Sequence, residues 1–516
     1  MALKRVEDRS TPREVYNWRP YVLALIAGWG GVLFGYDSAF IGGTIELPAF
    51  QTQFGLDKLS EDELAFTSSN IVLTCLSTGC FFGCILAFFI VEVLGRRVTL
   101  QCSSALFCLG AGLMLGAKNS LGMILVGRIV GGLGVGAVSL ATPLYIAEIA
   151  PPSIRGQLVG FYEIFLQAGG VVGFWIKYTF TNRQGPYILT LTIIALQWHI
   201  PVAVQLIPGG LLLAASLLLR ETPRWLYRQE RVNEAIVNLS WMRNLPAHHP
   251  YIQDEIQAIH AQFERETQGG SNEGLVAKLK ELGRPGIRNR LGVGICIMMC
   301  QNLTEAYYSP TIFSSIGITG TSNSLFATGI YGVVKMVATL VALVWLVDRV
   351  GRRKPLIAGA LVGALAMYYI AGFVAVAKPS GTGSPTPAGK FAPACIYIFA
   401  VAFCMSWNGI SWIICSEIFP LGVRALGQTI TSATQWLWQF VIARSTPYMI
   451  KYIGYGTYLF FGSCMVLMIP WAYFILPETK GVSLEDMDRL FGVLIEEGVG
   501  KNEIEEREVA NVHRLS

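Results

Sequence analysis

Apolar runs of about 20 residues dominate the chain, and each is long enough to cross a bilayer as an α-helix. Short polar segments separate these runs, and a longer one at 220–289 divides them six and six. This longer segment contains amphipathic patterns such as VNEAIVNLSWMRNL. The pattern predicts an all-α integral membrane protein with twelve transmembrane helices. The predicted spans are 20–43, 66–91, 98–116, 121–144, 156–180, 199–219, 290–313, 323–347, 355–376, 392–415, 426–449 and 453–475.

The two groups of six spans repeat one another. EVLGRR at 92–97 recurs as DRVGRR at 348–353, and ETPRW from Glu221 has a counterpart in PETKG, which contains Glu478. AEIAPPSIRG and SEIFPLGVRALG each place a Glu seven residues before an Arg. Three echoes in the same order indicate parallel repeats with a cavity between them, which is a transporter architecture. The predicted domains are an N-terminal half (1–219), a linker with short helices (220–289), a C-terminal half (290–476) and a tail (477–516).

Composition agrees with a membrane protein and excludes several other classes. The chain is 53% hydrophobic and 14% charged, whereas soluble domains are about 25% charged. No basic tract suggests a nucleic-acid surface. The eleven cysteines show no metal-ligand spacing, and no nucleophile–base pair or phosphate-binding loop is present. We therefore expect no enzyme activity, no cofactor and no metal, and the sequence leaves the oligomeric state open.

The placement of Lys and Arg predicts the orientation. Arg96, Arg155, Arg353 and Arg424 all fall on the side that holds both termini, while the opposite segment 44–65 is acidic. Because cytoplasmic loops are enriched in basic residues, both termini are predicted to be cytoplasmic. The N-terminus lacks the short apolar region and cleavage site of a signal peptide, so the first span is expected to direct insertion.

An aspartate lies inside the first predicted span. Asp37, in GGVLFGYDSAFIGG, would cost about 2.5–3.5 kcal/mol to insert as an ion. It lies about seven residues, or roughly 10 Å, below the predicted outer end of its helix. Arg128, in the fourth span, falls at a similar depth, so we predict that the two form a pair. A permanent salt bridge that fixes helix packing is the structural alternative, although such pairs often add little net stability.

The signatures of the chain resemble the sugar porters of the major facilitator superfamily. They are FGYDSAFIGG, GRIVGGLGVG, PLYIAEIAPPSIRG, ETPRWL, YYSPTIF, DRVGRR, SEIFPLGVRALG and LPETKG, and they extend over nearly the whole chain. NWRPYVLALIAGWGGVLFGYDSAFIGG and TQWLWQFVIARSTPYM are most similar to fungal quinate permeases. The resemblance implies the major facilitator fold and a plasma-membrane symporter that imports quinate with protons by alternating access. It also implies that Asp37 carries the proton and interacts with Arg128. A hexose or pentose porter with the same mechanism, or a nutrient sensor that does not transport, remains an alternative.

Charged residues at the predicted cytoplasmic helix ends form a second candidate set. We interpret them as ion pairs between the halves that hold the inner side closed and break when the halves rock. The alternative is that the arginines only set topology. The residues are Glu92, Arg96, Arg97, Glu148, Arg155, Asp348, Arg352, Arg353, Glu417 and Arg424.

The resemblance assigns substrate contacts to the fifth, seventh, tenth and eleventh spans. Glu163 stands where sugar porters usually carry a Gln. Amides offer both donors and acceptors, which suits a polyol, although a Gln within a helix is also a common packing contact. The assigned residues are Glu163, Gln167, Gln301, Asn302, Trp412, Gln435 and Gln439.

Two further features bear on the substrate. Arg444 favours a cyclic carboxylate over a neutral hexose, because guanidinium binds carboxylate through two parallel hydrogen bonds; snorkelling to the outer headgroups is the alternative. Lys335 is a second cation within a span. In the seventh span, about one helical turn of the family pattern, with its Gly and Asn, is missing between Thr304 and Tyr307. This departure predicts either a different binding mode or impaired transport.

Overall fold

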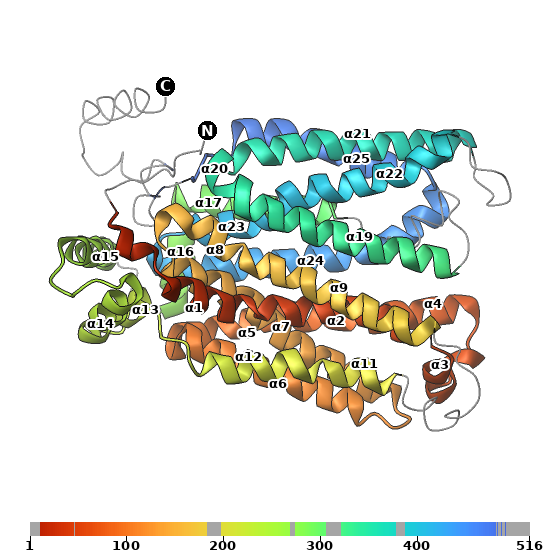
Figure 1. Cartoon of the computed structure of the whole chain (residues 1–516), viewed down its shortest axis with the longest axis horizontal. Helices are drawn as coiled ribbons and strands as arrows, with labels where there is room; N and C mark the ends of the chain where they lie inside the picture. The colour runs from red at the N-terminus through yellow and green to blue at the C-terminus, as the bar shows by residue number, and fades with distance from the viewer. Residues whose placement is uncertain are drawn as a thin grey trace.

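The structure, a computed structural model, is a bundle of long helices that lie side by side (Figure 1). It describes residues 11–45, 47–182, 198–268, 274–305, 321–377 and 387–480, together with 482, 487 and 491. No strand occurs in these ranges. The all-α class predicted from the hydrophobic pattern is therefore confirmed.

The first half of the bundle begins with a short 3₁₀ turn and continues through α12. Its first predicted span is two helices, α1 and α2, that meet at Trp29. The elements are η1 (Arg13–Tyr16), α1 (Trp18–Gly28), α2 (Gly30–Ile45), α3 (Pro48–Phe54), η2 (Leu56–Lys58), α4 (Glu61–Ser69), the π-helical turn η3 (Asn70–Thr74), α5 (Cys75–Leu94), α6 (Arg96–Leu115), α7 (Leu121–Ile149), η4 (Pro152–Ile154), α8 (Arg155–Val159), α9 (Phe161–Asn182), α11 (His199–Val204) and α12 (Leu206–Ser216).

Four linker helices and the second half follow. The linker helices are α13 (Pro223–Arg228), α14 (Val232–Arg243), α15 (Pro250–Gln268) and α16 (Gly274–Leu282). The second half contains α17 (Ile287–Leu303), α19 (Thr321–Val341), the π-helical turn η5 (Ala342–Leu346), α20 (Val347–Val350), α21 (Arg353–Ala377), α22 (Pro387–Phe403), the π-helical turn η6 (Cys404–Asn408), α23 (Gly409–Glu417), α24 (Leu421–Ile453) and α25 (Gly456–Phe474).

Ten helical segments of the described chain are long and apolar enough to cross a membrane. The predicted seventh and eleventh spans are the two that do not meet this measure. α17 has 17 residues and ends at Leu303, and residues 306–313, the remainder of the predicted span, lie outside the described chain. α24 is long enough at 33 residues, but it includes polar side chains such as Gln435 and Gln439. These two polar helices carry most of the amides that we assigned to the substrate.

The predicted acidic loop 44–65 is largely helical. It contains α3, η2 and the start of α4, where Ser60 and Glu63 form a capping box. The Ser60 amide donates to Glu63 Oε2 at 3.1 Å, and the Glu63 amide donates back to Ser60 Oγ at 3.4 Å. The Ser-x-x-Glu motif that starts this helix is visible in the sequence. It lies before the apolar run that defined the predicted span at 66.

The two ends of the bundle are distinct (Figure 1). Helices α13, α14 and α15 gather at one end, which we call the linker end, and α3 and α4 lie at the other, which we call the loop end. Between them, α9 of the first half packs against α19 of the second, and α5 packs against α24. Trp436 Nε1 donates to Ser139 Oγ across this interface at 3.0 Å. The two halves are therefore in direct contact in this conformation.

Glycines allow the close approach of α2 and α9. A Cβ built at Gly35 would lie 1.8 Å from the Leu166 carbonyl oxygen, and one at Gly31 would lie 2.2 Å from that of Tyr162. Small residues at helix contacts let backbones approach within a membrane. The clash would be with backbone, which cannot rotate away as a side chain can.

Gly35→Ala is therefore expected to separate α2 from α9 and to reduce the amount of folded protein. Overpacking costs about 1–3 kcal/mol in well-packed cores, and a backbone clash is expected to fall at or above that range. The measurement is thermal stability of detergent-extracted protein by fluorescence-detected size exclusion. Gly42→Ala is the matched control on the same helix, because a Cβ there meets nothing within 4 Å. Equal stability of the two variants would contradict the prediction.

Candidate functional site

The structure brings Asp37 and Arg128 together. Arg128 Nη1 donates to Asp37 Oδ1 at 2.6 Å, and both residues are buried, at 2% and 1% exposed. The Arg128 Nε donates to the carbonyl of Ile71 at 3.0 Å. Ile71 lies in the π-helical turn η3, and such turns free backbone carbonyls and often mark functional sites. The sequence pointed to the pair by depth, but η3 as its third member was not predicted.

Asp37 and Arg128 form an ion pair that is buried away from water. Asp37 Oδ2 has no hydrogen-bond partner within the described chain, so the carboxylate depends on Arg128 for its charge balance. Protonating Asp37 would remove the ionic attraction between the two side chains, while the Arg128 Nε could still donate to Ile71. The arrangement is suited to a switch, and the role of Asp37 in carrying a proton stays a prediction.

Four amide-bearing residues form a connected set in the second half. Asn302 Nδ2 donates to Gln435 Oε1 at 2.7 Å, which joins α17 to α24. Gln301 Nε2 donates to the backbone carbonyl of Asn408, in the π-helical turn η6, at 3.2 Å. Gln301 Oε1 and Asn408 Nδ2 are buried without a hydrogen-bond partner in the described chain. Buried polar atoms that lack partners are costly in a closed protein, and they are the atoms that a hydroxylated ligand could satisfy.

Glu163 faces this set from the first half. Its carboxylate lies near the Asn408 amide, and a Cβ on Gly409 would lie 3.5 Å from Glu163 Cγ. Together Glu163, Gln301, Asn302, Asn408 and Gln435 form what we call the polar cluster. The other two assigned amides, Gln167 of α9 and Gln439 of α24, are buried as well. Trp412 is buried against Tyr162, with ring centroids 5.7 Å apart. The side chains of the polar cluster are thus closed off from solvent on both sides.

Arg444 stacks on two aromatic rings. Its guanidinium lies over the Phe66 ring at 4.9 Å and over the Tyr448 ring at 5.8 Å. Phe66 belongs to α4, at the loop end. Sequence reasoning placed Arg444 towards that end of its helix, and its partner aromatic ring was not predicted.

An acidic residue beside the shortened part of the seventh span pairs with a cation of α19. Glu305, two residues beyond the end of α17, lies with Oε1 3.7 Å from Lys335 Nζ. Lys335 also lies over the rings of Tyr331 and Phe403, at 5.9 and 5.6 Å. Lys335, which the sequence identified as a second cation within a span, is therefore balanced by Glu305.

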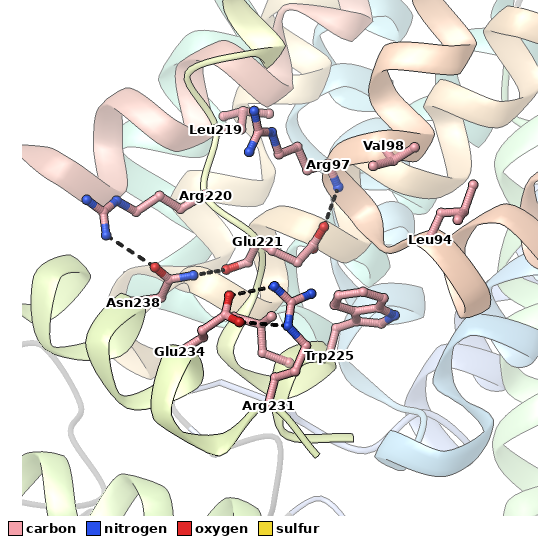
Figure 2. A pocket seen from close by; sticks show the side chains of 11 residues that line it. Leu94, Arg97, Val98, Leu219, Arg220, Glu221, Trp225, Arg231, Glu234 and Asn238 are labelled. Carbon is pink, nitrogen blue, oxygen red and sulfur yellow. Dashed lines mark hydrogen bonds and ion pairs between the residues drawn. The ribbon is translucent and has the colours of Figure 1, made fainter. Parts of the chain in front are cut away.

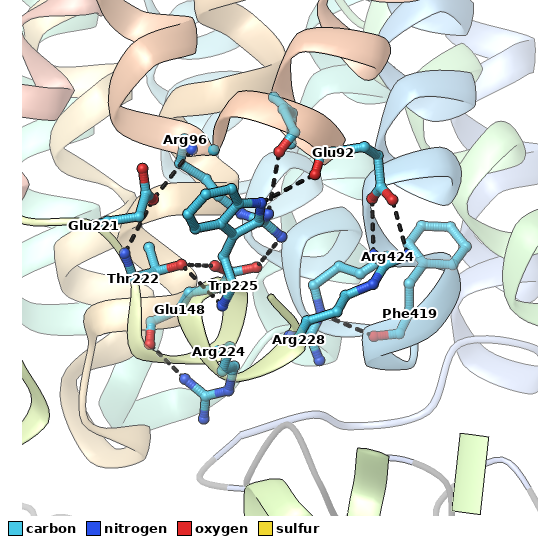
Figure 3. Close-up of polar contacts among 12 residues, drawn as sticks. Glu92, Arg96, Glu148, Glu221, Thr222, Arg224, Trp225, Arg228, Phe419 and Arg424 are labelled. Carbon is cyan, nitrogen blue, oxygen red and sulfur yellow. Dashed lines mark hydrogen bonds and ion pairs between the residues drawn. The ribbon is translucent and has the colours of Figure 1, made fainter. Parts of the chain in front are cut away.

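At the linker end of the first half, the buried Arg96–Glu148 ion pair lies close to Glu221, which accepts from backbone amides (Figure 3). Arg96 Nη2 donates to Glu148 Oε1 at 2.8 Å, and Thr222 Oγ1 donates to Glu148 Oε2 at 2.6 Å. Glu221 accepts from the amides of Arg96 and Arg97 at the start of α6, each at 3.1 Å. Carboxylates at a helix N-terminus are favoured because the first amides have no partner within the helix.

The second half repeats this network. Arg352 Nη2 donates to Glu417 Oε1 at 3.1 Å, and Thr479 Oγ1 donates to Glu417 Oε2 at 2.9 Å. Glu478 accepts from the amides of Arg352 and Arg353 at 2.9 and 3.1 Å. The echoes EVLGRR/DRVGRR and ETPRW/PETKG therefore correspond to one contact pattern used twice. Glu221, Thr222, Glu478 and Thr479 were missing from our candidate set, although the repeat that contains them was evident.

These contacts correct one interpretation. We expected the ion pairs at this end to join the two halves, but Arg96–Glu148 lies within the first half and Arg352–Glu417 within the second. Each Arg follows a tight glycine turn and reaches the nearest Glu of its own half. Glu92 pairs with the linker instead: Arg228 Nη2 lies 2.9 Å from its Oε2, and Lys278 contacts the same oxygen.

Arg155 contacts the segment that follows the second half. Its Nη1 donates to the carbonyl of Val482, beyond α25, at 3.2 Å. Arg424 Nε donates to the Phe419 carbonyl within its own half at 3.0 Å (Figure 3). The Arg353 guanidinium lies over the Tyr473 ring at 4.7 Å. The side chain of Asp348 lies outside the described part of the structure.

A cavity of about 360 Å³ opens beside the first network (Figure 2). Leu94 and Arg97 line it from the bundle, while Arg231, Glu234 and Asn238 line it from the linker helices. Burial raises the pKa of Glu221, which also lines this cavity, and the amide donors around it oppose that shift. The Arg231–Glu234 pair at 2.6 Å and the Glu221 contacts occupy the polar groups of the wall. Sequence reasoning gave no sign of this cavity, because the linker helices that close it lie far from α5 and α6 in the chain.

The paired six-helix halves, the buried ion pair near the loop end and the closed polar cluster between the halves are the features of a secondary transporter. Among solved structures, the proton:xylose symporter XylE bound to 6-bromo-6-deoxy-D-glucose has a TM-score of 0.79 and 26% identity, covering 92% of this chain and 99% of that one. The inward-open form of XylE from E. coli has a lower TM-score, 0.64, with 27% identity, covering 91% and 99%. The fucose transporter FucP in its outward conformation shares the fold, with a TM-score of 0.54.

The chain belongs to the sugar (and other) transporter family, whose model matches residues 23–491. It is 45% identical to a probable quinate permease of Neosartorya fischeri over 95% of this chain and 90% of that protein. It is also 45% identical to a probable quinate permease of Aspergillus niger, over 95% and 91%. These similarities confirm the predicted major facilitator fold, and they place the chain among multi-pass membrane transporters of small molecules rather than among enzymes.

Proposed function

We propose that this protein imports quinate together with protons across the plasma membrane by alternating access. In this proposal the linker end and both termini are cytoplasmic, and the loop end faces outward. The observation that carries proton coupling is the buried Asp37–Arg128 pair, with its 2.6 Å contact within the bundle. A solved structure with this fold is named as a proton:xylose symporter, which supports the same coupling here.

Quinate is proposed on two grounds. Relatives at 45% identity over nearly the whole chain are named probable quinate permeases. The polar cluster supplies amide donors and acceptors that match the hydroxyl groups of a polyol. We assign substrate contacts to Glu163, Gln301, Asn302 and Gln435, with Gln167, Gln439 and Trp412 around them. A hexose or pentose would use the same amides, so it is the alternative that the experiments must exclude.

The test of this proposal is radiolabelled uptake in cells that lack their own porters. Quinate uptake that is saturable, stimulated by outer acidity and unaffected by excess glucose or xylose is expected. Uptake of glucose or xylose with no uptake of quinate would reverse the assignment. Failure to move any of the three, with protein shown at the surface, would indicate that the shortened seventh span abolishes transport.

A separate prediction concerns Arg444, which we propose contacts the carboxylate of quinate on its way from the loop end. Charge-assisted contacts contribute about 1.5–3 kcal/mol, so Arg444→Gln is expected to weaken the apparent affinity for quinate roughly 10- to 100-fold. The measurement is concentration-dependent uptake at matched surface expression, with a neutral polyol analogue as the comparison ligand. A guanidinium that only stacks on Phe66 and Tyr448 would give equal, modest losses for both ligands, and that result would remove Arg444 from the site.

A further inference from the structure

Glu163 is a buried carboxyl that the predicted proton site does not use. It is the third residue of α9 and is 1% exposed. Neither Oε1 nor Oε2 has a hydrogen-bond partner within the described chain. Burying an ionised carboxylate is costly unless it is both paired and hydrogen-bonded. The charges around Glu163 therefore determine which protonation state of its carboxyl is more stable in this conformation.

The groups that face Glu163 come from both halves. Lys335 is the nearby cation, but it is balanced by Glu305, whose Oε1 lies 3.7 Å from its Nζ. One ammonium therefore serves two carboxyl groups. With both ionised, Glu163, Glu305 and Lys335 together would carry one net negative charge, and Glu163 is the member that is fully buried. With Glu163 neutral, the charges balance. The other polar and titratable neighbours are Tyr162, Cys404 and Asn408, none of which supplies a positive charge.

Glu163 also lies at the contact between the halves. α9 packs on α2, the helix that carries Asp37, through the close approach at Gly31. On its other side, Glu163 Cγ would lie 3.5 Å from a Cβ at Gly409 of α23, and Leu343 of η5 occupies the same contact. Movement of one half against the other would change the environment of this carboxyl directly. The π-helical turns η5 and η6 of the second half both lie beside Glu163.

We propose that Glu163 is a second proton-binding carboxyl, so that two protons accompany each quinate. This inference rests on the proposed function and extends it. An anionic ligand in the polar cluster places negative charge beside Glu163, and a nearby like charge disfavours the ionised form. Binding of quinate therefore favours protonation of Glu163, and protonation of Glu163 favours binding of quinate to the same extent.

The balance of the cycle follows. Asp37 and Glu163 each bind one proton from the outer side, quinate enters as a monoanion, and all three are released on the cytoplasmic side. One net positive charge then moves inward with each quinate. With Asp37 alone, one proton and one anion would move no net charge. The two schemes differ in whether the membrane potential drives uptake.

The experiment uses the full-length protein in proteoliposomes with a potassium diffusion potential and no pH gradient. For the wild type, quinate is expected to accumulate with an inside-negative potential, by about tenfold for each 59 mV when one charge moves. Glu163→Gln, which has the shape of the protonated acid, is expected to lose this response and to accumulate quinate only with a pH gradient. The measured quantity is the accumulation ratio at steady state, so a slower variant is still informative.

Glu234→Gln is the matched control. It makes the same chemical change in the exposed pair with Arg231, on a linker helix and outside the polar cluster. Its response to potential should therefore equal that of the wild type. Wild-type accumulation that ignores the potential would overturn the proposal. So would a Glu163→Gln variant that responds as the wild type does. No quinate uptake by the wild type under either gradient would instead refute the proposed function itself.

If Glu163→Gln does not transport quinate, measurements of quinate binding test the proposal instead. Quinate affinity of the purified protein, measured across pH, is expected to depend on two protons in the wild type and on one in the variant. An unchanged dependence would overturn the proposal, and so would a complete loss of binding, because glutamine mimics the protonated acid that the proposal requires.

Discussion

Asp37→Asn is expected to abolish accumulation of quinate against a gradient while leaving exchange of quinate across the membrane measurable. Asparagine cannot bind and release a proton, so the ligand would no longer be coupled to the proton gradient. The amide also removes the charge that balances Arg128 in a buried site, and breaking such a pair costs about 3–5 kcal/mol. We expect one conformation to become strongly preferred, with net uptake at background level.

The measurement compares net uptake with counterflow, in which labelled quinate enters vesicles preloaded with unlabelled quinate. Asp57→Asn is the matched control, because Asp57 is an exposed residue at the loop end and makes the same chemical change. Concentrative uptake by Asp37→Asn at the wild-type level would refute its role in coupling. Loss of both net uptake and counterflow, with normal amounts of folded protein, would favour the purely structural role of the pair.

The second large effect is expected at the linker end. Glu417→Gln removes the charge that balances Arg352, and the side chains of both are 1% exposed. The pair lies within the second half, but Glu417 also accepts from Thr479, and Val482 of the same segment accepts from Arg155 of the first half. Breaking the buried pair costs about 3–5 kcal/mol, and part of this loss should weaken the Arg155 contact that joins the first half to this segment. The linker end is then expected to open more often.

The native Cys415 reports this opening. It is buried, two residues before Glu417 on α23. Its labelling by a small thiol reagent applied from the linker end should be at least about tenfold faster in Glu417→Gln, since about 1.4 kcal/mol corresponds to a factor of ten. The experiment uses a background in which the other reactive cysteines are replaced. Glu234→Gln, in the exposed pair with Arg231, is the control, because surface pairs contribute about 0–1 kcal/mol. Equal labelling in the two variants would leave these residues with a role in topology alone.

The pairing of Asp37 with Arg128 could be predicted from the sequence. Depth along two antiparallel spans placed the two residues at the same level, because an α-helix advances a fixed distance per residue. The amides of α17 and α24 were assigned by the resemblance to sugar porters and not by depth. Neither kind of reasoning could find Ile71, because the π-helical turn that exposes its carbonyl depends on how α5 meets its neighbours and leaves no mark in the hydrophobic pattern.

The ion pairs at the linker end show where sequence reasoning went wrong. The repeat identified Arg96, Glu148, Arg352 and Glu417 as equivalent in pairs, but repetition does not say whether partners lie in one half or in two. That depends on which helix ends meet after packing. Likewise, the sequence identified Lys335 as a second cation within a span, and only the folded structure shows that Glu305 lies beside it.

The sequence by itself determined the membrane-spanning helices, the twofold repeat and the family. These follow from local hydrophobicity and from short motifs, and they do not depend on how the two halves are placed relative to one another. The tertiary structure alone decided which charges balance which. A buried charge is stabilised mainly by atoms within a few ångströms, and those atoms come from other helices, as Arg128 does for Asp37 and Glu148 does for Arg96. Within the described chain, Glu163 has two carboxyl oxygens without hydrogen-bond partners for this reason: Lys335, the cation near it, is already held by Glu305.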